Sequence, residues 1–475
     1  MRNIIMRASA TAAALVLAIG GALNASPLPA ASLPHPSTFK GIEVMSCDST
    51  QVPYRIPAIA TVGEGPHKGR LVAVADYRFN RGDIGIKVDD GPIDLRVSYS
   101  DDNGRTWSEP APMTLNGKKP VSRGTGRDKD FYYAFGDPAI VADRESGRLL
   151  VMSCAGVAGF WGGRRNAPQQ VAKWWSEDGG ETWTEVEDGT DQIYSLFDDT
   201  TPWGYIDSMF FGSGRIMQSR NVKKGDTYRL YAVLSAFIND EKAGRDPKNF
   251  VLYSDDFGKT WNILGDPMTP PVPGMADEPK AEELPDGSVL LAGRGFRGGR
   301  NYNIYKYDDA EAATGTWGEV FNTHLNNPNP INACNGEILI IPVKSTTSDE
   351  TAYMAIQTYP FGPGRQKVGL SWKILDQLSD FDTPEHFGSN WEGRYQISDL
   401  PSCYTTLTLQ DDGSIGCLYE EDRYGCYGGY CIVYQNLTVN QITDGKWTIT
   451  TDPDNLIAQR VSTPVATKKK AKTKK

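Results

Sequence analysis

Short runs of apolar and β-branched residues recur along the chain, and each one follows a group of turn residues. The clearest runs are residues 70–77, 149–154, 229–236, 289–293 and 337–343. Runs of this length between Gly, Pro, Asn and Asp are typical of β-strands. Convincing helical periodicity is nearly absent between them. The pattern therefore predicts a protein built from many short strands.

One turn sequence occurs three times, at Ser100–Trp107, Ser176–Trp183 and Ser254–Trp261. All three copies fit Ser-x-Asp-x-Gly-x-Thr-Trp, and a looser copy stands at Thr314–Trp317. Ser and Asp bond to nearby backbone and Gly supplies a positive φ, so the motif predicts a tight hairpin. The Trp that follows is large enough to wedge between neighbouring sheets. The tryptophans are spaced by 76 and 78 residues, which indicates repeated sheets and favours an all-β propeller over a single sandwich.

The chain is divided by composition. Arg2 and Arg7 precede an apolar run, Ala8–Ala22, and small residues follow it. This predicts an export signal over residues 1–25, with an end that extends to 31 in the alternative reading. The run is short for a membrane anchor, which is the competing interpretation. We expect a Pro-rich lead over 26–38, one propeller over 39–460, and a Lys-rich tail over 461–475 that is a solvated tail or a weak cell-surface attachment.

Net charge and cysteine content limit the classes of partner and cofactor that we expect. A net charge of −10 argues against nucleic acid as a partner, whereas anionic substrates stay open because a cationic pocket can lie within an acidic surface. The chain has seven cysteines, an odd number that leaves at least one unpaired. Cys426 and Cys431 flank a Gly-Gly turn and are one candidate pair, with buried free thiols as the alternative. The spacing is not that of a zinc site, and we expect no metal or organic cofactor.

A set of motifs carries a resemblance to known enzymes. In chain order they are Tyr54–Pro57, Asp76–Asp83, Phe135–Pro138, Asp277–Leu284 with Arg294 after it, Gly364–Arg365 with a degenerate turn box at Gly369–Trp372, and Cys403–Glu420. Their order, together with the turn boxes, resembles that of the bacterial exo-sialidases, or neuraminidases, with Asp-box repeats. The resemblance covers nearly all of the chain after the signal, and it implies a six-bladed β-propeller.

By this resemblance, three arginines bind the carboxylate that sialic acid carries on its anomeric carbon. They are Arg55, Arg294 and Arg365. Arginine suits this task because its planar guanidinium binds a carboxylate through two bonds and keeps its charge. The competing interpretation is a surface arginine paired with an acid, and we expect that role for Arg297 and Arg300.

The family pattern places Tyr404 as the nucleophile and Glu278 as its base. A carboxylate nucleophile would meet the substrate's own carboxylate, whereas a neutral phenol avoids that repulsion. A phenol has a pKa of about 10, so it needs a base within hydrogen-bond reach. Glu283 is the second choice for the base.

Proton transfer to the leaving group is assigned to Asp83, which stands five residues after Arg78 where some family members have six. Its competitors are Asp76, Asp89 and Asp90. The resemblance further implies that Arg78 contacts sugar hydroxyls and that Asp137 binds the amide or hydroxyls. Trp161 is expected to wall the acetamido pocket or to pack in the core. The box residues Asp102, Asp178 and Asp256 are expected to be structural.

The sequence thus predicts a secreted or periplasmic retaining exo-α-sialidase. It would release terminal sialic acid from glycoproteins, glycolipids and oligosaccharides through a sialyl-tyrosine intermediate. The expected partners are sialylated glycoconjugates, with no membrane-spanning segment after signal cleavage. Two alternatives stay open: a trans-sialidase, and a non-catalytic propeller that binds sialoglycans.

Overall fold

A computed structural model describes most of the chain between Phe39 and Thr450. The described residues are 39–47, 52–79, 82–84, 92–113, 131–238, 246–274, 276–295, 298–323, 334–425 and 429–450. The predicted signal, Pro-rich lead and Lys-rich tail lie outside them. The compact unit begins at Phe39, and within the described residues no helix is long and apolar enough to cross a membrane.

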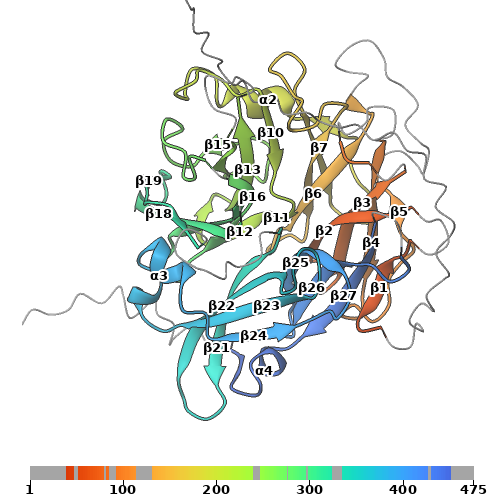
Figure 1. Cartoon of the computed structure of the whole chain (residues 1–475), viewed down its shortest axis with the longest axis vertical. Helices are drawn as coiled ribbons and strands as arrows, with labels where there is room; N and C mark the ends of the chain where they lie inside the picture. Colours follow the sequence, from red (N-terminus) through yellow and green to blue (C-terminus); the bar gives the residue numbers. More distant parts are fainter. Residues whose placement is uncertain are drawn as a thin grey trace, which may run out of the picture. The chain divides into compact units, whose positions relative to one another are not determined.

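The strands form six sheets that follow one another along the chain (Figure 1). The first contains β2 (Tyr54–Thr61), β3 (Leu71–Arg78), β4 (Ile93–Ser100) and β5 (Ala111–Pro112). The second contains β6 (Phe135–Ala142), β7 (Leu149–Ala155), β8 (Gln170–Ser176), β9 (Glu187–Asp188) and β11 (Gly214–Arg215). The third contains β10 (Ser208–Phe211), β12 (Met217–Lys224), β13 (Thr227–Phe237), β14 (Lys248–Ser254) and β15 (Asn262–Ile263).

The remaining three sheets complete the ring. The fourth contains β16 (Ala276–Glu283), β17 (Val289–Gly295), β18 (Arg300–Asp309), β19 (Thr314–Trp317) and β20 (Phe321–Asn322). The fifth contains β21 (Ile338–Ser345), β22 (Thr351–Pro360), β23 (Val368–Leu375), β24 (Gly393–Gln396) and β28 (Trp447–Ile449). The sixth contains β25 (Ser402–Leu409), β26 (Ile415–Glu421), β27 (Cys431–Leu437) and β1 (Ile42–Met45).

The first described strand closes the ring. Strand β1 pairs antiparallel with β27, with Ile42 opposite Tyr434, so the beginning and the end of the propeller share one sheet. Closure of this kind leaves few exposed strand edges. The predicted six-bladed β-propeller is confirmed. All five predicted strands are present as well, as β3, β7, β13, β17 and β21.

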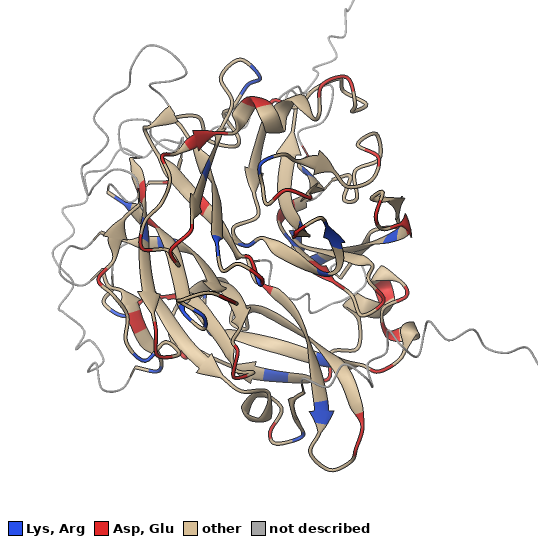
Figure 2. Ribbon diagram, turned by 180° about the vertical axis from the view of Figure 1, so that it is seen from behind, with Lys and Arg blue, Asp and Glu red and all other residues tan. Residues whose placement is uncertain are grey.

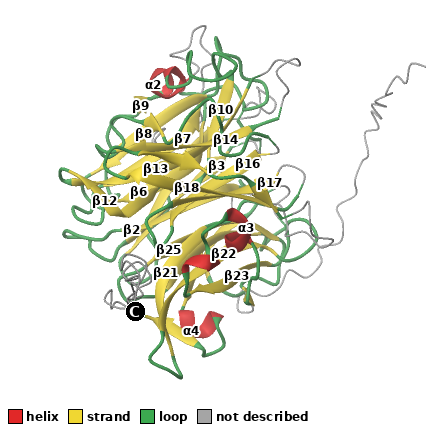
Figure 3. Ribbon diagram, turned by 90° about the vertical axis from the view of Figure 1, so that its left-hand side faces the viewer, coloured by secondary structure: helices red, strands yellow, loops and turns green. Residues whose placement is uncertain are grey.

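Helices are short and few in the described residues (Figure 3). They are α2 (Thr190–Ser195), α3 (Pro384–Gly388), α4 (Val439–Ile442) and the 3₁₀ turn η2 (Leu378–Asp380). Basic and acidic positions are interspersed along the blades (Figure 2).

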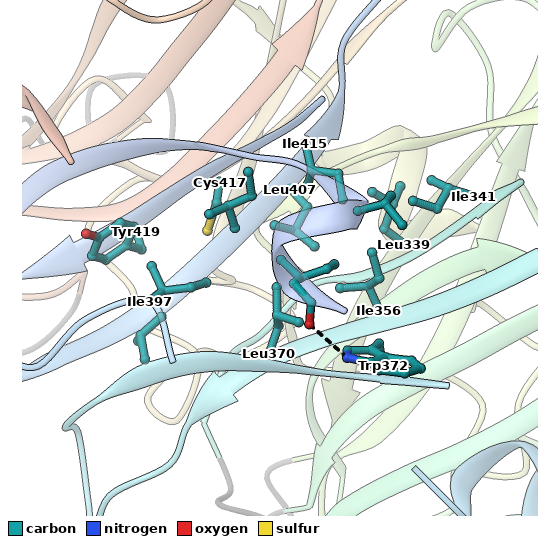
Figure 4. Close-up of a cluster of buried hydrophobic side chains, with 14 of the residues drawn as sticks. Leu339, Ile341, Ile356, Leu370, Trp372, Ile397, Leu407, Ile415, Cys417 and Tyr419 are labelled. Carbon is teal, nitrogen blue, oxygen red and sulfur yellow. Dashed lines mark hydrogen bonds between the residues drawn. The ribbon is translucent and has the colours of Figure 1, made fainter. Parts of the chain in front are cut away.

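Apolar side chains from neighbouring blades form the core. Between the fifth and sixth blades, Leu370 and Trp372 of β23 share one buried cluster with Leu407 of β25 and Cys417 of β26 (Figure 4). The Trp372 indole N–H donates to the Ile442 carbonyl at 3.0 Å. The degenerate turn box expected at Gly369–Trp372 is wrong, because these residues form no turn: they lie inside β23 and pair with both β22 and β24. Trp372 nevertheless packs between blades as the box tryptophans do.

The three full turn boxes have the predicted hairpin geometry. In the first copy, the Ser100 hydroxyl donates to Asp102 at 2.8 Å, and Asp102 accepts the Thr106 N–H at 2.9 Å. Gly104 has a φ of +80°, and a Cβ there would lie 2.0 Å from a ring carbon of Tyr434, so only glycine fits. The Trp107 ring lies 5.3 Å from the Tyr434 ring in the next blade. The expected wedge between sheets is confirmed for this copy.

Replacing Asp178 by Ala is expected to lower the free energy of unfolding and to leave the chemistry of the folded protein unchanged. Asp178 accepts the Ser176 hydroxyl at 2.8 Å, the Thr182 N–H at 2.9 Å and the Thr182 hydroxyl, and Ala removes all three bonds. Because this turn is largely solvated, we expect a loss of about 1 kcal/mol. Thermal denaturation checks this, with Glu185→Ala as an exposed acidic control. A large fall in turnover at an unchanged melting temperature would show that Asp178 is not purely structural.

Candidate active site

A cavity of about 410 Å³ opens among the first strands of the blades. This volume lies within the range of small-molecule sites. Charged residues from six segments line it together with an apolar wall. The lining residues are Arg55, Ile56, Asp83, Ile84, Asp137, Gly159, Phe160, Trp161, Gly162, Gln169, Phe210, Phe211, Ser213, Asp277, Glu278, Arg294, Arg365 and Tyr404.

Irregularities in the first strands place the candidate side chains in this cavity. The register shifts between Arg55 and Ala58 in β2, between Gly136 and Ala139 in β6, between Ala276 and Pro279 in β16, and between Ser402 and Thr405 in β25. A bulge leaves a residue out of the ladder and re-aims its side chain. Each shift lies near the beginning of its strand, and β2, β16 and β25 lie around the middle of the ring (Figure 1). The candidates therefore meet at one place.

Three of these bulges contain a proline or end at one. Pro57, Pro138 and Pro279 each directly follow a residue that lines the cavity. Proline has no backbone N–H, so inside a sheet it is tolerated at bulges and edges. Ile56 and Asp137, just before two of these prolines, both have a φ of 56°, an uncommon conformation for side chains with a Cβ.

The three predicted arginines converge on the cavity. The guanidinium carbons of Arg55 and Arg365 lie 5.2 and 5.3 Å from the centre of the Tyr404 ring. Arg294 lies on β17 and pairs with Asp277 at 3.3 Å. Arg297 lies outside the described residues. The expectation that Arg300 is a surface arginine paired with an acid is wrong, because Arg300 is 1% exposed and donates to the carbonyl of Cys334.

Glu420 holds one of these arginines, and sequence reasoning gave it no role. Its carboxylate accepts the Arg55 Nε–H at 2.6 Å and the Ile56 backbone N–H at 2.7 Å. The other oxygen accepts the Tyr404 N–H at 3.3 Å. Glu420 is fully buried, and its pKa lies below the ordinary value: burial raises it, but Arg55 and the N–H donors outweigh burial. A charged Glu420 thus fixes both the Arg55 fork and the backbone of Tyr404.

The Tyr404 hydroxyl donates to Glu278 Oε1 across the cavity floor. Burial, followed by the negative charge of Glu278, raises the pKa of Tyr404 well above its ordinary value. The other oxygen of Glu278 pairs with Arg294 Nη1 at 3.1 Å. The structure thus brings together a protonated phenol, a carboxylate positioned to take its proton, and an arginine that orients the carboxylate.

The second choice for the base lies elsewhere. Glu283 is buried beside β12, where it accepts the Ser219 hydroxyl and the Arg220 N–H, both at 2.6 Å. It does not line the cavity.

Asp83 lines the same cavity and belongs to a network of ionic contacts. Arg78 Nη2 lies 3.2 Å from Asp83 and 2.8 Å from Asp76. Asp76 in turn accepts the Asp137 N–H at 3.0 Å. Arg78 is buried behind the cavity wall, so its contact with sugar hydroxyls stays a prediction. Of the competitors, Asp76 is buried behind the wall as well, and Asp89 and Asp90 lie outside the described residues.

The pKa values of the three acids in this network, Asp76, Asp83 and Asp137, are shifted in different directions. Burial raises the pKa of Asp76 to about 7 against the opposing charge of Arg78. Burial, then the charges of Asp83 and Asp76, raises the pKa of Asp137 well above its ordinary value. For Asp83, burial is outweighed by Arg78 and Arg55, so its pKa is lowered. Neighbouring acids whose pKa values are shifted apart in this way are typical of functional sites.

Trp161 forms part of an aromatic wall. Its side chain is 52% exposed, and it packs on Phe160 and Phe237 at ring distances of 4.9 and 5.4 Å. Of the two roles considered, the wall of the cavity fits its position and the protein core does not. Phe210 and Phe211 extend this wall, and no sequence signal singled them out.

A polar layer lies deeper along the first strands. Lys280 and Thr406 stand two residues beyond Glu278 and Tyr404 on β16 and β25, and Glu337 approaches beside them. A Cβ on Gly214 would lie 2.8 Å from Lys280 Nζ and 3.2 Å from both Glu337 Oε2 and Thr406 Oγ1. The glycine therefore leaves room for these three side chains to approach one another. Sequence reasoning missed this layer because its members come from four separate strands or loops.

The suggested Cys426–Cys431 pair is wrong, because Cys431 is a free thiol. Cys426 itself lies outside the described residues. Cys47 is disulfide-bonded, and its sulfur lies 3.6 Å from that of Cys431. Cys154, Cys334, Cys403 and Cys417 are free and buried, as the alternative interpretation expected.

The arrangement suits displacement chemistry on an anionic substrate. Three arginines offer a planar cationic clamp, a phenol is paired with a base, and the Asp83 carboxyl lines the same cavity. A substrate carboxylate in the clamp would hold the adjacent carbon near the phenol oxygen.

Comparisons with known proteins agree with the motifs. Residues 88–417 match the sequence model of a family described as BNR repeat-like domain. A sialidase of Micromonospora viridifaciens is 28% identical over 410 residues, which cover 80% of this chain and 52% of that protein. A sialidase of Bacteroides fragilis (strain YCH46) is 23% identical over 395 residues, covering 78% and 61%. The chain thus spans about half to three fifths of the length of these relatives. The resemblance to bacterial sialidases is confirmed.

Solved structures show the same fold. The Hadza microbial sialidase Hz136 superposes with a TM-score of 0.61 at 21% identity, over 85% of this chain and 69% of that one. A leech intramolecular trans-sialidase gives a TM-score of 0.62 at 15% identity, over 86% and 71%.

Proposed function

The chain belongs to the BNR repeat-like family, and from that premise we propose that it is a retaining exo-α-sialidase. The observation that carries the proposal is the Tyr404 hydroxyl bonded to Glu278 on the floor of a cavity that three arginines face. Most glycosidases use a pair of carboxyl groups, whereas sialidases use a tyrosine nucleophile. A neutral tyrosine suits a substrate that carries a carboxylate on its anomeric carbon. The substrates proposed are glycoproteins, glycolipids and oligosaccharides that end in sialic acid.

Binding begins with the carboxylate. Arg55, Arg294 and Arg365 present fixed positive charges to one side of the cavity, and Glu420 and the Asp277–Glu278 pair hold two of them in place. A clamp on the carboxylate orients the anomeric carbon toward the Tyr404 oxygen. Asp137 and Trp161 also line the cavity, and we assign them to the amide and hydroxyl groups of the substrate.

In the first chemical step, the Tyr404 oxygen forms a bond to the anomeric carbon as the glycosidic bond breaks. The phenolic proton passes to Glu278, which already accepts it as a hydrogen bond. Asp83 gives its proton to the leaving oxygen. In the second step, water attacks the same carbon, Asp83 takes a proton from it, and Glu278 returns its proton to Tyr404. Two displacements leave the configuration unchanged.

The protonation of Asp83 is coupled to substrate binding. Without substrate, Arg78 and Arg55 hold the pKa of Asp83 below its ordinary value. A substrate carboxylate that pairs with Arg55 offsets this positive charge, so the pKa of Asp83 rises in the complex. Asp83, the general acid, is therefore protonated when the leaving group is in place.

The direct test is turnover of a fluorogenic α-sialoside by the purified protein, with the matching galactoside as a control that lacks the carboxylate. We expect release from the sialoside alone. Binding of sialoglycans without any turnover would favour the non-catalytic propeller. Product analysis with an added sugar acceptor separates hydrolysis from transfer.

Replacing any one of the three arginines by Lys is expected to weaken binding of an unsaturated sialic acid analogue. Lys keeps the charge but cannot reproduce the planar fork. Since a hydrogen bond to a charged group contributes roughly 1.5–3 kcal/mol, we expect losses of about tenfold to a hundredfold. Titration calorimetry checks this, with Arg144→Lys as a control outside the cavity. Normal binding by all three variants would place the carboxylate clamp elsewhere.

A further inference from the structure

Two free thiols lie directly behind the proposed nucleophile. The sulfurs of Cys334 and Cys403 are 3.4 Å apart, and both side chains are buried. Neither residue takes part in a disulfide. The proposed mechanism uses neither thiol.

The pair is mechanically connected to Tyr404. Cys403 precedes Tyr404 within the β25 bulge, where neither residue has a ladder partner. Cys334 and Cys403 pack in one apolar cluster with Ile56 and Tyr404. On the other side, the buried Arg300 donates to the Cys334 carbonyl and fixes that segment. A movement of Cys403 is therefore passed to Tyr404 through the backbone that they share in the bulge, and it works against the hydrogen bond from the Tyr404 N–H to Glu420.

The two sulfurs differ in reactivity. The hydrogen bond from Cys403 lowers the pKa of Cys334, whereas burial, and then Cys334 itself, raises the pKa of Cys403 well above its ordinary value. The thiolate is the form that reacts with oxidants. Cys334 is also the more accessible of the two, at 2% exposed against 0% for Cys403. We therefore assign the first reaction to Cys334 and the resolving attack to Cys403, whose sulfur lies 3.4 Å away.

We propose that Cys334 and Cys403 are a redox-sensitive dithiol that a peroxide converts to a disulfide, and that this bond lowers turnover by displacing Tyr404. The second half rests on the proposed function. The Cys334 sulfur attacks the peroxide O–O bond and becomes a sulfenic acid, with release of one water from hydrogen peroxide. The Cys403 sulfur then attacks the Cys334 sulfur and expels a second water. Two thiols are oxidised and one peroxide is reduced to two waters.

Geometry sets the expected effect. A disulfide has a sulfur–sulfur bond of about 2.05 Å, so the sulfurs must approach by about 1.4 Å. Because Arg300 holds the Cys334 carbonyl, part of this movement falls on the bulge that carries Tyr404. A misplacement of about 1 Å at a reacting group costs up to about a hundredfold in rate. We expect kcat to fall about tenfold to a hundredfold.

The experiment treats the reduced full chain with hydrogen peroxide and measures two quantities. Peptide mass mapping detects the 334–403 crosslink and needs no activity. Turnover of a fluorogenic sialoside is measured before oxidation, after it, and after a thiol reductant. We expect the crosslink to form, kcat to fall in step with it, and the reductant to restore turnover. Cys334→Ala should keep its turnover in peroxide.

Two control variants separate this pair from the other thiols. Cys417→Ala removes a buried thiol of β26, and Cys431→Ala removes the thiol beside the Cys47 disulfide. Both should stay as sensitive as the unaltered chain. No crosslink, or a complete crosslink with unchanged turnover, overturns the inference. If the reduced chain has no turnover on any sialoside, the proposed function fails, and with it the second half of the inference, while mapping still decides the thiol chemistry.

Discussion

Tyr404→Phe is expected to remove nearly all retaining turnover while the fold and the affinity for sialic acid stay close to those of the unaltered protein. The substitution deletes one oxygen, the atom that bonds to Glu278 and that would attack the anomeric carbon. The arginine clamp does not depend on that oxygen. Loss of a covalent nucleophile typically lowers kcat by on the order of 10³-fold or more. Steady-state kinetics check the loss of turnover, and binding of a sialic acid analogue to the same preparation checks the unchanged affinity.

A second tyrosine provides the control for this variant. Tyr359 is also buried, and its hydroxyl shares a hydrogen bond with Ser371 at 2.6 Å, away from the cavity. Tyr359→Phe should retain turnover. Ordinary kinetics in Tyr404→Phe would show that another group attacks the anomeric carbon.

Asp83→Ala is expected to cripple cleavage of natural sialosides far more than cleavage of aryl sialosides. A sugar alcohol is a poor leaving group and needs the proton of Asp83, whereas a phenolate leaves with little assistance. General acid catalysis contributes about 10²–10⁴-fold, which sets the gap expected between the two substrates. The measurement is kcat/KM for both substrate types on one purified variant.

The aryl sialoside is the internal control in this comparison, because it needs the same clamp and the same nucleophile. Equal losses on both substrates would move the acid role from Asp83 to Asp76, Asp89 or Asp90. The structure already makes Asp76 a poor candidate, since it is fully buried and held by Arg78.

Sequence reasoning reached the strands, the three hairpin turns and the charged residues that line the cavity, but not its aromatic wall at Phe210 and Phe211. The turn boxes succeeded because their geometry is local: Ser100, Asp102, Gly104 and Thr106 satisfy one another within a few residues. The number of blades came from family resemblance, because the box spacing indicates repetition without counting sheets.

Longer-range features escaped sequence reasoning. Glu420 holds Arg55 across 365 residues of chain, and Arg300 was misassigned because nothing around it shows that it is buried. The bulges next to Pro57, Pro138 and Pro279 could have been predicted from the sequence, because a proline inside an apolar strand-like run indicates a bulge. Bulges that coincide in several blades would have located the cavity before any family was considered.

The stereochemistry of the first product tests the proposed double displacement through Tyr404 most directly. Proton NMR during hydrolysis of an α-sialoside by the purified chain distinguishes the anomer released by the enzyme from the one that later forms in solution. The account predicts that α-sialic acid appears first, as two displacements through Tyr404 require. Release of the β anomer first would mean direct attack by water and would contradict the proposed roles of Tyr404 and Glu278.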